Sequence, residues 1–590
     1  MKKALSVFLM TAMAFGAFAQ DAEPVADVNI AEFSGNAAVQ WGVDLDTMKT
    51  GFKNSYEVNL KLNLLNNGTK STTGDGVWGE LVLKTEEDTF IGWENGDDSP
   101  EMNDEYIDAN TGLMGGKGAD KRNMGLKVYV DVAKIHIGPA YIGIKRGDTQ
   151  TGELKMDAAI RSADDDQSKW LNNVGPVKYS EGIVLGLDTE VVKVDLDLRS
   201  YTSLTSADGH EDERKSHQYT DAYAAALEAE LKGDGIGVEG LSVKGGVSFN
   251  FAENYYPGPG TEGTNGWIYD KDGPYAPWKR DLPLTDARML GYSASVGYKL
   301  GLDDTFYVRP QVGFTGETEF YEDEDAKLSG TVTGNLAIAA GLLFGWGEIG
   351  MDQNAGVYYL DDDHAKKVSP GVGLVAYIPL PASSKETTED FVTKIKAYDA
   401  IAARIMPSFY SGELVPGLTA AAYADIVIPN TGKDENEVSS SESSRVIYVA
   451  GEDAATPIAF ALGAQYAIPV GEMTITPKAG IRFANAAYVD YKSQGFFGEK
   501  GVGVFKDMGV QQKLAADAED RTKYGLESDG NFMNLKLGVD VGGLIDNTTL
   551  SVIWETKNIL NDTPYGDGVG DEARFGPKLG TLNFKAKIAL

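Results

Sequence analysis

Apolar and polar side chains alternate strictly over segments of about ten residues, from one end of the chain to the other. In residues 55–64 (SYEVNLKLNL), every even-numbered residue is apolar and every odd-numbered residue is polar. The last ten residues, 581–590 (TLNFKAKIAL), follow the same rule except at Ala589. Successive side chains of a strand point to opposite sides. Both segments are therefore predicted to be strands with one apolar face and one polar face.

The same alternation recurs in many other segments. A strand of about ten residues, tilted to the membrane normal, is long enough to cross a bilayer. Soluble sandwiches also alternate, but their strands average about five to six residues. The segments predicted as further strands are 33–45, 77–84, 192–198, 241–251, 290–300, 306–314, 336–346, 458–468, 473–483 and 535–541.

The connections between these segments are of two kinds. Tight turns include 301–304 and 468–471, and the long polar connections are 94–122, 146–182, 202–218, 253–288, 430–444 and 490–530. Short turns on one side and long loops on the other are typical of outer-membrane barrels. The predicted fold is therefore all-β: a transmembrane antiparallel β-barrel of roughly 16–22 strands with long polar extracellular loops.

One segment departs from the strand pattern. Residues 389–406 (EDFVTKIKAYDAIAARIM) contain apolar side chains at helical spacing, at Ile395, Tyr398, Ile401, Ala402 and Ile405. The spacing predicts a short helix in a loop or in the lumen, with a strand as the alternative.

The first 19 residues read as an export signal. Met1–Ala19 combines two lysines, an apolar run and an Ala-Phe-Ala cleavage pattern, so it is predicted to be a cleaved secretory signal peptide. Residues 20–32 form a polar, flexible lead-in. No later apolar run reaches the roughly 18 residues of a transmembrane helix. The chain contains no cysteine, which excludes disulfides, a lipid-modified cysteine and thiolate chemistry. The expected location is the bacterial outer membrane.

Composition and charge narrow the possible functions. The mean hydropathy of −0.25 is compatible with a barrel, because only alternate residues face lipid. The net charge is −35, and it becomes −37 when Lys2 and Lys3 leave with the signal peptide. Such an acidic chain is not expected to bind nucleic acid, which requires a basic surface. No nucleophile elbow or other catalytic motif is present in the sequence, so we expect no enzyme.

The polar faces of the predicted strands carry charges of both signs. If the apolar faces meet outer-membrane lipid, the polar faces line a lumen, and mixed charges favour a hydrated, weakly selective channel. The first functional hypothesis is a porin for small hydrophilic solutes, and the alternative is a surface adhesin or structural protein that the barrel only anchors. The pore-lining candidates are Glu57, Asn59, Lys61, Glu80, Lys84, Lys193, Asp195, Asp197, Arg309, Lys478, Arg482, Lys536, Lys585 and Lys587.

An Arg-Gly-Asp tripeptide opens one of the long loops. Arg146, Gly147 and Asp148 are a candidate adhesion site, because an exposed tripeptide of this kind can present a guanidinium and a carboxylate to integrins. Three common loop residues also meet by chance, so coincidence is the alternative.

Two acidic turns are weak candidates for calcium binding. Oxygen ligands on a turn suit Ca²⁺, but neither turn continues to the spaced glutamate of a full EF-hand loop. The residues are Asp270, Asp272, Asp361, Asp362 and Asp363. Solvated turns are the alternative, and no other cofactor is expected.

Three early segments carry a family resemblance: residues 33–46 (FSGNAAVQWGVDLD), 51–65 (GFKNSYEVNLKLNLL) and 74–84 (GDGVWGELVLK). They resemble the major outer sheath proteins of treponemes and the related Tpr family of spirochaetes. The resemblance implies an abundant outer-membrane pore, often a homotrimer, whose exposed loops contact host matrix proteins.

The resemblance also implies two regions, 33–375 and 376–590, the second ending in a closing strand at 581–590. The closing strand is where such chains commonly carry the signal for the outer-membrane assembly machinery. Strand alternation is as strong before Leu300 as after it. We therefore expect one continuous barrel that includes both regions.

Overall fold

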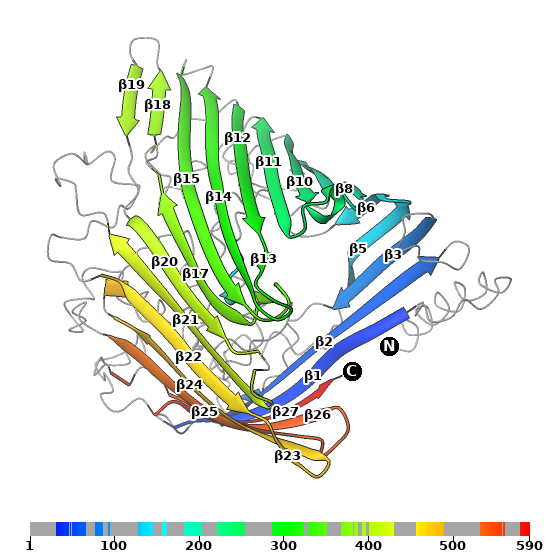
Figure 1. Ribbon diagram of the computed structural model, residues 1–590, viewed down its shortest axis with the longest axis vertical. Coiled ribbons are helices and arrows are strands. Elements are labelled where there is room, and N and C mark those ends of the chain that lie inside the picture. Colours follow the sequence, from blue (N-terminus) through cyan, green and yellow to red (C-terminus); the bar gives the residue numbers. More distant parts are fainter. Residues whose placement is uncertain are drawn as a thin grey trace, which may run out of the picture.

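The alternating segments form strands of one large antiparallel sheet in a computed structural model of the chain (Figure 1). The structure describes residues 31–45, 48, 50–65, 77–85, 93–94, 128–145, 156–161, 182–202, 221–253, 286–323, 328–350, 367–380, 383–387, 392–396, 401–412, 414–429, 456–485, 487–488, 531–556, 559–560 and 579–589. The signal peptide and residues 20–30 lie outside this part. No helix within the described residues has the length and apolarity to span a membrane.

Twenty of the described strands pair in a closed ring, each with the strand before it and the strand after it. The ring strands are β1 (Ala31–Asp44), β2 (Thr50–Leu65), β3 (Val77–Thr85), β5 (Val128–Ile137), β6 (Ala140–Lys145), β8 (Gly182–Asp188), β9 (Val192–Thr202), β10 (Asp221–Lys232), β11 (Leu241–Glu253), β12 (Asp286–Tyr298), β14 (Tyr307–Asp323), β15 (Leu328–Gly345), β17 (Gly371–Pro379), β20 (Ile401–Tyr410), β21 (Leu418–Pro429), β22 (Ile458–Tyr466), β24 (Met473–Ala484), β25 (Phe532–Gly542), β26 (Thr548–Glu555) and β27 (Thr581–Ala589). The predicted barrel is confirmed, with a strand number inside the expected range.

Shorter elements extend the ring strands or lie apart from them. The extensions are β4 (Trp93–Glu94), β13 (Leu300–Gly301), β18 (Ser383–Thr387), β19 (Val392–Lys396) and β23 (Ile468–Val470). A 3-10 turn, η5 (Asp234–Ile236), lies between β10 and β11. The strands β7 (Ile160–Arg161) and β16 (Lys367–Val368) pair only with each other, in a separate two-stranded sheet.

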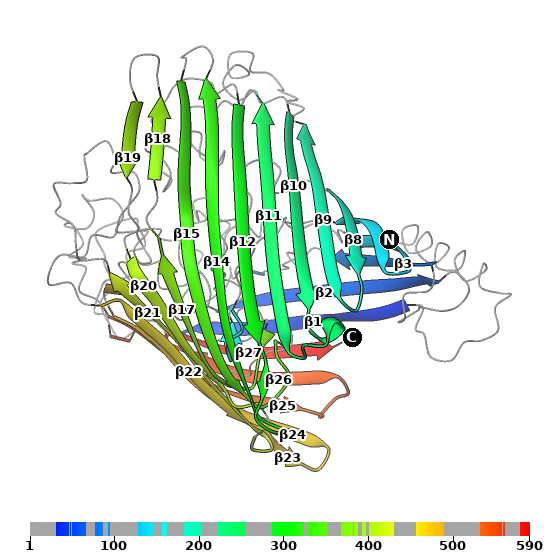
Figure 2. The same ribbon diagram turned by 45° about the horizontal axis from the view of Figure 1, so that its top comes forward.

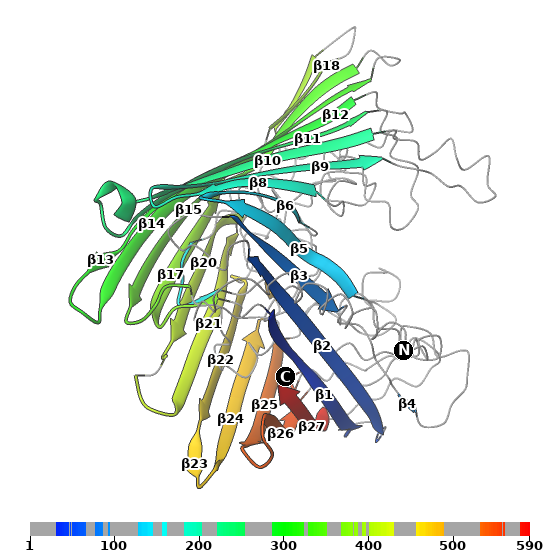
Figure 3. The same ribbon diagram turned by 90° about the vertical axis from the view of Figure 1, so that its right-hand side faces the viewer.

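The first and last strands close the ring (Figure 3). β1 pairs with β27 in antiparallel register from Asn36↔Ala589 to Asp44↔Thr581. Trp41 and Phe584 lie opposite each other in this register, with ring centroids 5.4 Å apart. Closure pairs both edges of β1 and β27, so these two strands present no row of unpaired backbone groups to lipid. Among the described strands, β19 pairs with β18 alone and forms an edge beyond β15 (Figure 2).

The two ends of the barrel differ in the length of their connections. One end carries short turns such as 138–139, 189–191, 471–472 and 543–547, and we call it the turn end. The opposite end, the loop end, carries the long connections 86–127, 146–181, 254–285, 430–457 and 485–531. β1 starts and β27 finishes at the turn end. In bacterial barrels the short turns face the periplasm and the long loops face the outside.

The described part of residues 389–406 is strand, so the predicted helix is wrong there and the strand alternative is confirmed. Val392–Lys396 forms β19 and Ile401–Tyr410 forms β20, which pairs with β17 and β21. The apolar residues at helical spacing occur here because this strand is buried on its inner face and apolar on its outer face, so the usual alternation is lost.

The predicted division of the chain at residues 375 and 376 falls inside β17. The division of the chain into these two regions comes from the family resemblance, and it stays a prediction. The predicted first strand is present but begins at Ala31, two residues earlier than expected.

Candidate pore and its two walls

The outer face of the barrel is apolar and uncovered. Large side chains that point outward remain substantially exposed on strands all around the ring. Examples are Val39, Ile135, Ile142, Ile183, Val247, Phe249, Leu342, Leu374, Leu462, Val539 and Ile588. An apolar surface of this extent is far larger than soluble monomers present to water, and it matches the lipid-facing band of a membrane barrel. The opposite residue rows therefore face the lumen.

The lumen side of β2–β11 is rich in charges, and we call it the charged wall. Its charged residues on neighbouring strands form ion pairs: Lys61 Nζ lies 3.5 Å from Glu80 Oε1, and Lys84 Nζ lies 2.9 Å from Asp131 Oδ2. The inward side chains that take part in charge interactions on this wall include Lys61, Glu80, Lys84, Asp131, Lys134, His136, Asp188, Lys193, Asp195, Glu228, Glu230, Lys232 and Lys244.

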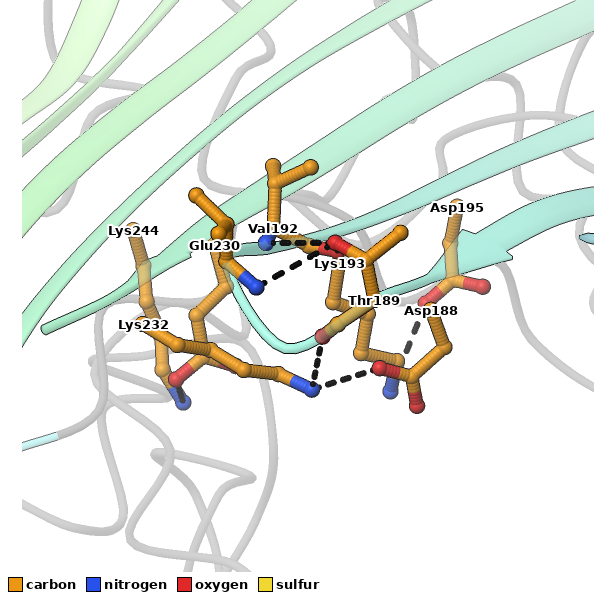
Figure 4. Close-up of polar contacts among 9 residues, drawn as sticks. Asp188, Thr189, Val192, Lys193, Asp195, Glu230, Lys232 and Lys244 are labelled. Atoms are coloured by element: carbon orange, nitrogen blue, oxygen red, sulfur yellow. Dashed lines mark hydrogen bonds and ion pairs between the residues drawn. The ribbon is translucent and has the colours of Figure 1, made fainter. Parts of the chain in front are cut away.

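Close to the turn end, the charged wall is organised around the turn between β8 and β9 (Figure 4). Lys232 Nζ bridges this turn, at 2.5 Å from Asp188 Oδ1 and 2.9 Å from the carbonyl oxygen of Thr189. Beside it, Lys193 pairs with Asp195 at 3.5 Å, and Lys244 pairs with Glu230 at 3.6 Å.

The lysines of this cluster remain open to water. The side chain of Lys193 is 43% exposed and that of Lys244 is 50% exposed. Asp195 also interacts electrostatically with Lys134 of β5, and Glu228 interacts with Lys193 and Lys244. Charges of both signs therefore form one connected stripe from β5 to β11 that a hydrated solute or ion can reach.

An aromatic stack lies within the charged wall where β3, β5 and β6 meet. The rings of Trp78 and His136 are stacked, with centroids 3.7 Å apart and an angle of 4° between their planes. Tyr141 lies beside His136 at 5.3 Å, and Lys134 Nζ lies 4.6 Å above the Tyr141 ring. Glu80 Oε2 is 3.9 Å from His136 Nε2. Lumen aromatics beside charges provide flat apolar surface without breaking the ion-pair network.

The inward faces of β24–β26 also carry ion pairs, but these are less exposed. Lys478 Nζ lies 2.6 Å from Asp540 Oδ2, and Lys536 Nζ lies 3.3 Å from Glu555 Oε2. All four side chains keep between 15% and 23% of their surface exposed. The inward side chains here are less exposed than those of the charged wall and more exposed than those of β14–β22.

The inward faces of β14–β22 are buried, and we call them the sealed wall. Their side chains are mostly apolar or small, and they have almost no contact with solvent. The members are Thr315, Ala337, Ala339, Leu343, Val375, Tyr377, Met406, Ser408, Tyr410, Ala421, Tyr423, Val427, Ala459 and Ala461. Residues 156–161, which we call the inner segment, cover part of this wall from the lumen side, with Met156 and Ile160 themselves buried.

The sealed wall contains a buried ion pair. Arg404 of β20 donates two hydrogen bonds to Asp425 of β21, from Nε to Oδ1 at 2.7 Å and from Nη2 to Oδ2 at 2.6 Å. The Tyr488 hydroxyl donates a third to Asp425 Oδ2, at 2.6 Å. Burial raises the pKa of Tyr488 well above its ordinary value, and the neighbouring Asp425 carboxylate adds to this shift. The bidentate geometry satisfies both charges away from water.

The structure separates the sequence-predicted pore residues into groups. Asn59, Lys61, Glu80, Lys84, Lys193 and Asp195 lie on the charged wall, and Lys478, Lys536, Lys585 and Lys587 point inward from β24, β25 and β27. Asp197 and Arg482 also belong to inward rows, but they are only 6% and 5% exposed. Arg309 is held by Asp157, with 2.7 Å between Nε and Oδ2. Glu57 pairs with Asn36 in the ladder, and its side chain lies outside the described part.

Three other groups of predicted residues cannot be placed. The tripeptide Arg146, Gly147 and Asp148 and the acidic turns at 270–272 and 361–363 lie outside the described residues. Among the residues that are described, no three His, Asp or Glu side chains gather as a metal site would require.

Sequence reasoning missed the buried ion pair and the inner segment. Arg404 stands alone in the apolar run IAARIM, and Asp425 stands alone in AAAYADIVIP. A single charge inside each of two strongly apolar strands is a signal for a buried pair, because a lone buried charge is too costly to keep. The inner segment has no comparable signal in its sequence.

Two curated relatives match the whole chain. Major surface protein MspTL of Treponema lecithinolyticum is 29% identical over the full length of both chains. Major outer membrane protein MspA of Treponema maltophilum is 27% identical, again over the full length of both. The resemblance seen in the first strands thus extends to the complete sequence. No protein-family model matches it.

Solved outer-membrane proteins are similar at a much lower level. The match with OpdK of Pseudomonas aeruginosa, solved with vanillate, covers 95% of this chain and 98% of the OpdK chain, at 8% identity and a TM-score of 0.34. The match with a loop-deletion mutant of OmpT from Vibrio cholerae covers 95% of this chain and 99% of the OmpT chain, at 7% identity and a TM-score of 0.25. Such likenesses say nothing about individual residues or solutes.

Proposed function

We propose that this chain, a full-length relative of treponemal major surface proteins, is a porin of the bacterial outer membrane that lets small hydrophilic solutes diffuse passively. The observation that carries the proposal is the contrast between the two faces of the ring. Apolar side chains stay exposed outside, while connected charges such as Lys193 and Lys244 stay open to water inside. That combination suits a hydrated passage through lipid.

The size of the ring is sufficient for such a passage. Strands spaced about 4.8 Å apart and tilted by about 40° give a twenty-stranded barrel a backbone diameter of roughly 40 Å. Barrels with 16–18 strands already enclose an aqueous channel. The inner segment covers one wall of this ring, so the proposed passage follows the charged wall.

The lumen charges favour weak selectivity between cations and anions. Acidic and basic side chains alternate across the charged wall and neutralise each other in pairs, as in Lys61–Glu80 and Lys84–Asp131. A passage with balanced charges attracts ions of both signs without binding either tightly, which suits diffusion. The excess of acidic residues in the whole chain, with a net charge of −35, is expected to favour cations at the mouth.

Single-channel recording tests this function. Purified protein, refolded in detergent and added to a planar lipid bilayer, should produce discrete conductance steps in potassium chloride. The Phe584→Asp variant is the matched control, because a charge on the outward face of the closing strand should prevent insertion and abolish the steps. If the wild-type protein inserts and no steps occur at any voltage, the porin proposal is wrong.

An adhesin or structural surface protein is the second candidate function. It is favoured by the concentration of long connections at the loop end, which would face the outside of the cell. In that case host matrix proteins are the partners, and the barrel is an anchor. Binding of the refolded protein to immobilised matrix proteins, combined with absent conductance, would favour this candidate over the porin.

The assembly of the protein follows from the same proposal. The outer-membrane assembly machinery would receive the exported chain after removal of the signal peptide, and β27 would close against β1. A homotrimer, as the family resemblance implies, stays a prediction. Cross-linking of the protein in intact membranes, followed by gel electrophoresis, would show whether three copies associate.

A further inference from the structure

The inner segment, Met156–Arg161, lies against strands that are distant from it along the ring. It belongs to the connection between β6 and β8, which are the fifth and sixth strands of the ring. Its contacts are with β14, β15, β17 and β20, which are the eleventh to fourteenth strands. The contacted side chains belong to the inward rows, so the segment lies inside the barrel and on another wall from the strands that bracket it.

Polar contacts fix the first half of the inner segment to β14. The backbone N–H of Asp157 donates to Gln311 Oε1 at 2.7 Å, and Gln311 Nε2 donates back to the carbonyl oxygen of Asp157 at 3.0 Å. The carboxylate of Asp157 pairs with Arg309, at 2.7 Å from Nε. The backbone and the side chain of one residue are thus both bound, which defines its position and orientation.

The second half of the inner segment is tied to β20 and to the turn end. The backbone N–H of Ala159 donates to Ser408 Oγ at 3.1 Å, and the carbonyl oxygen of Ala159 accepts from Ser369 N–H at 2.9 Å. Ile160 and Val368 then lie opposite each other in the β7–β16 ladder. β7 comes from a connection of the loop end, whereas β16 comes from the connection between β15 and β17 at the turn end. The ladder joins chain from both mouths inside the lumen.

Two glycines of the sealed wall make room for the inner segment. A Cβ atom on Gly373 of β17 would lie 2.7 Å from Ala159 N and 3.1 Å from Ala158 Cα. A Cβ atom on Gly341 of β15 would lie 3.1 Å from Met156 Cβ. Both glycines have ordinary strand dihedrals, so close approach of another backbone explains their presence better than conformational need.

We propose that the inner segment is a fixed constriction that sets the size cut-off of the pore and directs solutes along the charged wall. The inference rests on the proposed pore function and deepens it. A segment that is buried, hydrogen-bonded at both ends and fitted to wall glycines behaves as part of the wall. It removes the β14–β20 side of the lumen from the water-filled cross-section, and leaves passage to small solutes that tolerate charges of both signs.

Displacing the inner segment tests this inference. Gly373→Val places side-chain atoms where the backbone of Ala158 and Ala159 now lies, so the segment must move away from the wall. We expect single-channel conductance to rise roughly 1.5-fold or more, because conductance grows with open cross-section. Larger poly(ethylene glycol) molecules should also enter and block the current. Gly542→Val is the matched control: this glycine is at the end of β25, and no atom lies within 4 Å of an added Cβ.

A second variant replaces residues 156–161 with a Gly-Ser linker of the same length. It removes the docking groups without changing any ring strand, and it should raise the conductance and the size cut-off like Gly373→Val. Because the chain has no cysteine, Ile160→Cys reports the position of the segment directly. Ile160 is 1% exposed, so a thiol reagent should modify Cys at this position slowly in the parent and quickly in the Gly373→Val background.

The outcomes separate the two proposals. Absence of channel steps in the wild-type protein would overturn the pore function itself. Wild-type steps with the same conductance and size cut-off in the Gly-Ser variant would overturn the constriction and leave the pore intact. An equal rise in Gly542→Val and Gly373→Val would also contradict it, since the effect would then not depend on the inner segment.

Discussion

The charged wall and the sealed wall are built from the same kind of strand but fill their inward positions differently. On the charged wall, ion pairs such as Lys193–Asp195 stay partly open to water. On the sealed wall, Arg404 and Asp425 form a pair with side chains 7% and 0% exposed, among apolar neighbours. Outward positions are apolar on both walls. Whether an inward side chain contacts water or other protein atoms therefore decides whether the position can hold an exposed charge or must be apolar or fully paired.

The comparison also assigns different tasks to the two walls. An ion pair in water contributes little to stability, but in the proposed pore it sets the local field that a passing ion meets. A buried pair with complete hydrogen bonding has no contact with solutes, and loss of one member leaves an uncompensated charge. The charged wall should therefore control permeation, and the sealed wall should control stability.

The largest expected effect on stability comes from breaking the buried pair. Asp425→Ala leaves the Arg404 guanidinium buried without its carboxylate and should destabilise the barrel by about 3–5 kcal/mol. Lys244→Ala, on the charged wall, should cost no more than about 1 kcal/mol. Unfolding by guanidinium chloride in detergent micelles, monitored by the heat-dependent gel shift of barrels, would measure both losses of stability. Equal losses would remove the distinction between the walls.

Charge reversal on the charged wall should change selectivity with little change in stability. Lys193→Glu combined with Lys244→Glu makes the cluster near the turn end strongly acidic. The ratio of potassium to chloride permeability, from the reversal potential in a salt gradient, should rise roughly threefold or more. Glu472→Lys, at an exposed turn outside the strands, is the control and should shift the ratio much less. An unchanged ratio in the double variant would mean that ions take another route.

A smaller effect is expected at Tyr488, which completes the buried pair. Tyr488→Phe removes the hydrogen bond to Asp425 Oδ2 and should cost about 1–3 kcal/mol near neutral pH. Because burial raises the pKa of Tyr488, the folded barrel favours the neutral phenol, and this contribution is complete below the ordinary value of 10.0. It is lost as the pH rises from there towards the higher folded value. Unfolding curves from pH 8 upward should therefore fall less steeply for the Phe variant, and parallel curves would contradict the assignment.

The smallest expected effect is at Asp303, in the turn between β12 and β14. Backbone N–H groups of Phe306 and Thr305 donate to its carboxylate, at 2.7 and 2.8 Å, and lower its pKa below 3.8. Its contribution is present above that value and is lost as the pH falls through the lower folded value. Asp303→Asn should slightly reduce stability at neutral pH, and the difference should disappear in strong acid. A difference that is independent of pH would show that charge is not involved.

The sequence predicts the charged wall better than the sealed wall, for a physical reason. Strands such as 55–64 have water on one side and lipid on the other, so polar and apolar residues alternate and the pattern is legible. In β20, the inner face meets protein, so Met406 and Tyr410 replace polar residues and the alternation disappears. Because the alternation is lost, the spacing of apolar residues in 389–406 predicts a helix as well as a strand.

The inner segment could not be predicted from the pattern at all. Residues 156–161 (MDAAIR) are a short apolar stretch inside a long polar connection, and nothing in them indicates which wall they contact. Their position depends on Gln311 and Ser408, which lie about 150 and 250 residues later in the chain. Single polar residues on distant strands carry no periodic signal, so only the folded chain brings them together.

Cysteine accessibility tests the central claim, that one wall of the lumen carries water and the other does not. The chain lacks cysteine, so Lys193→Cys and Ala461→Cys each introduce a single thiol on an inward row, one on the charged wall and one on the sealed wall. A water-soluble, charged thiol reagent, added during single-channel recording, should modify the first quickly and change its conductance, and should leave the second unmodified. Equal modification of both, or rapid modification of Cys at position 461 alone, would contradict the account.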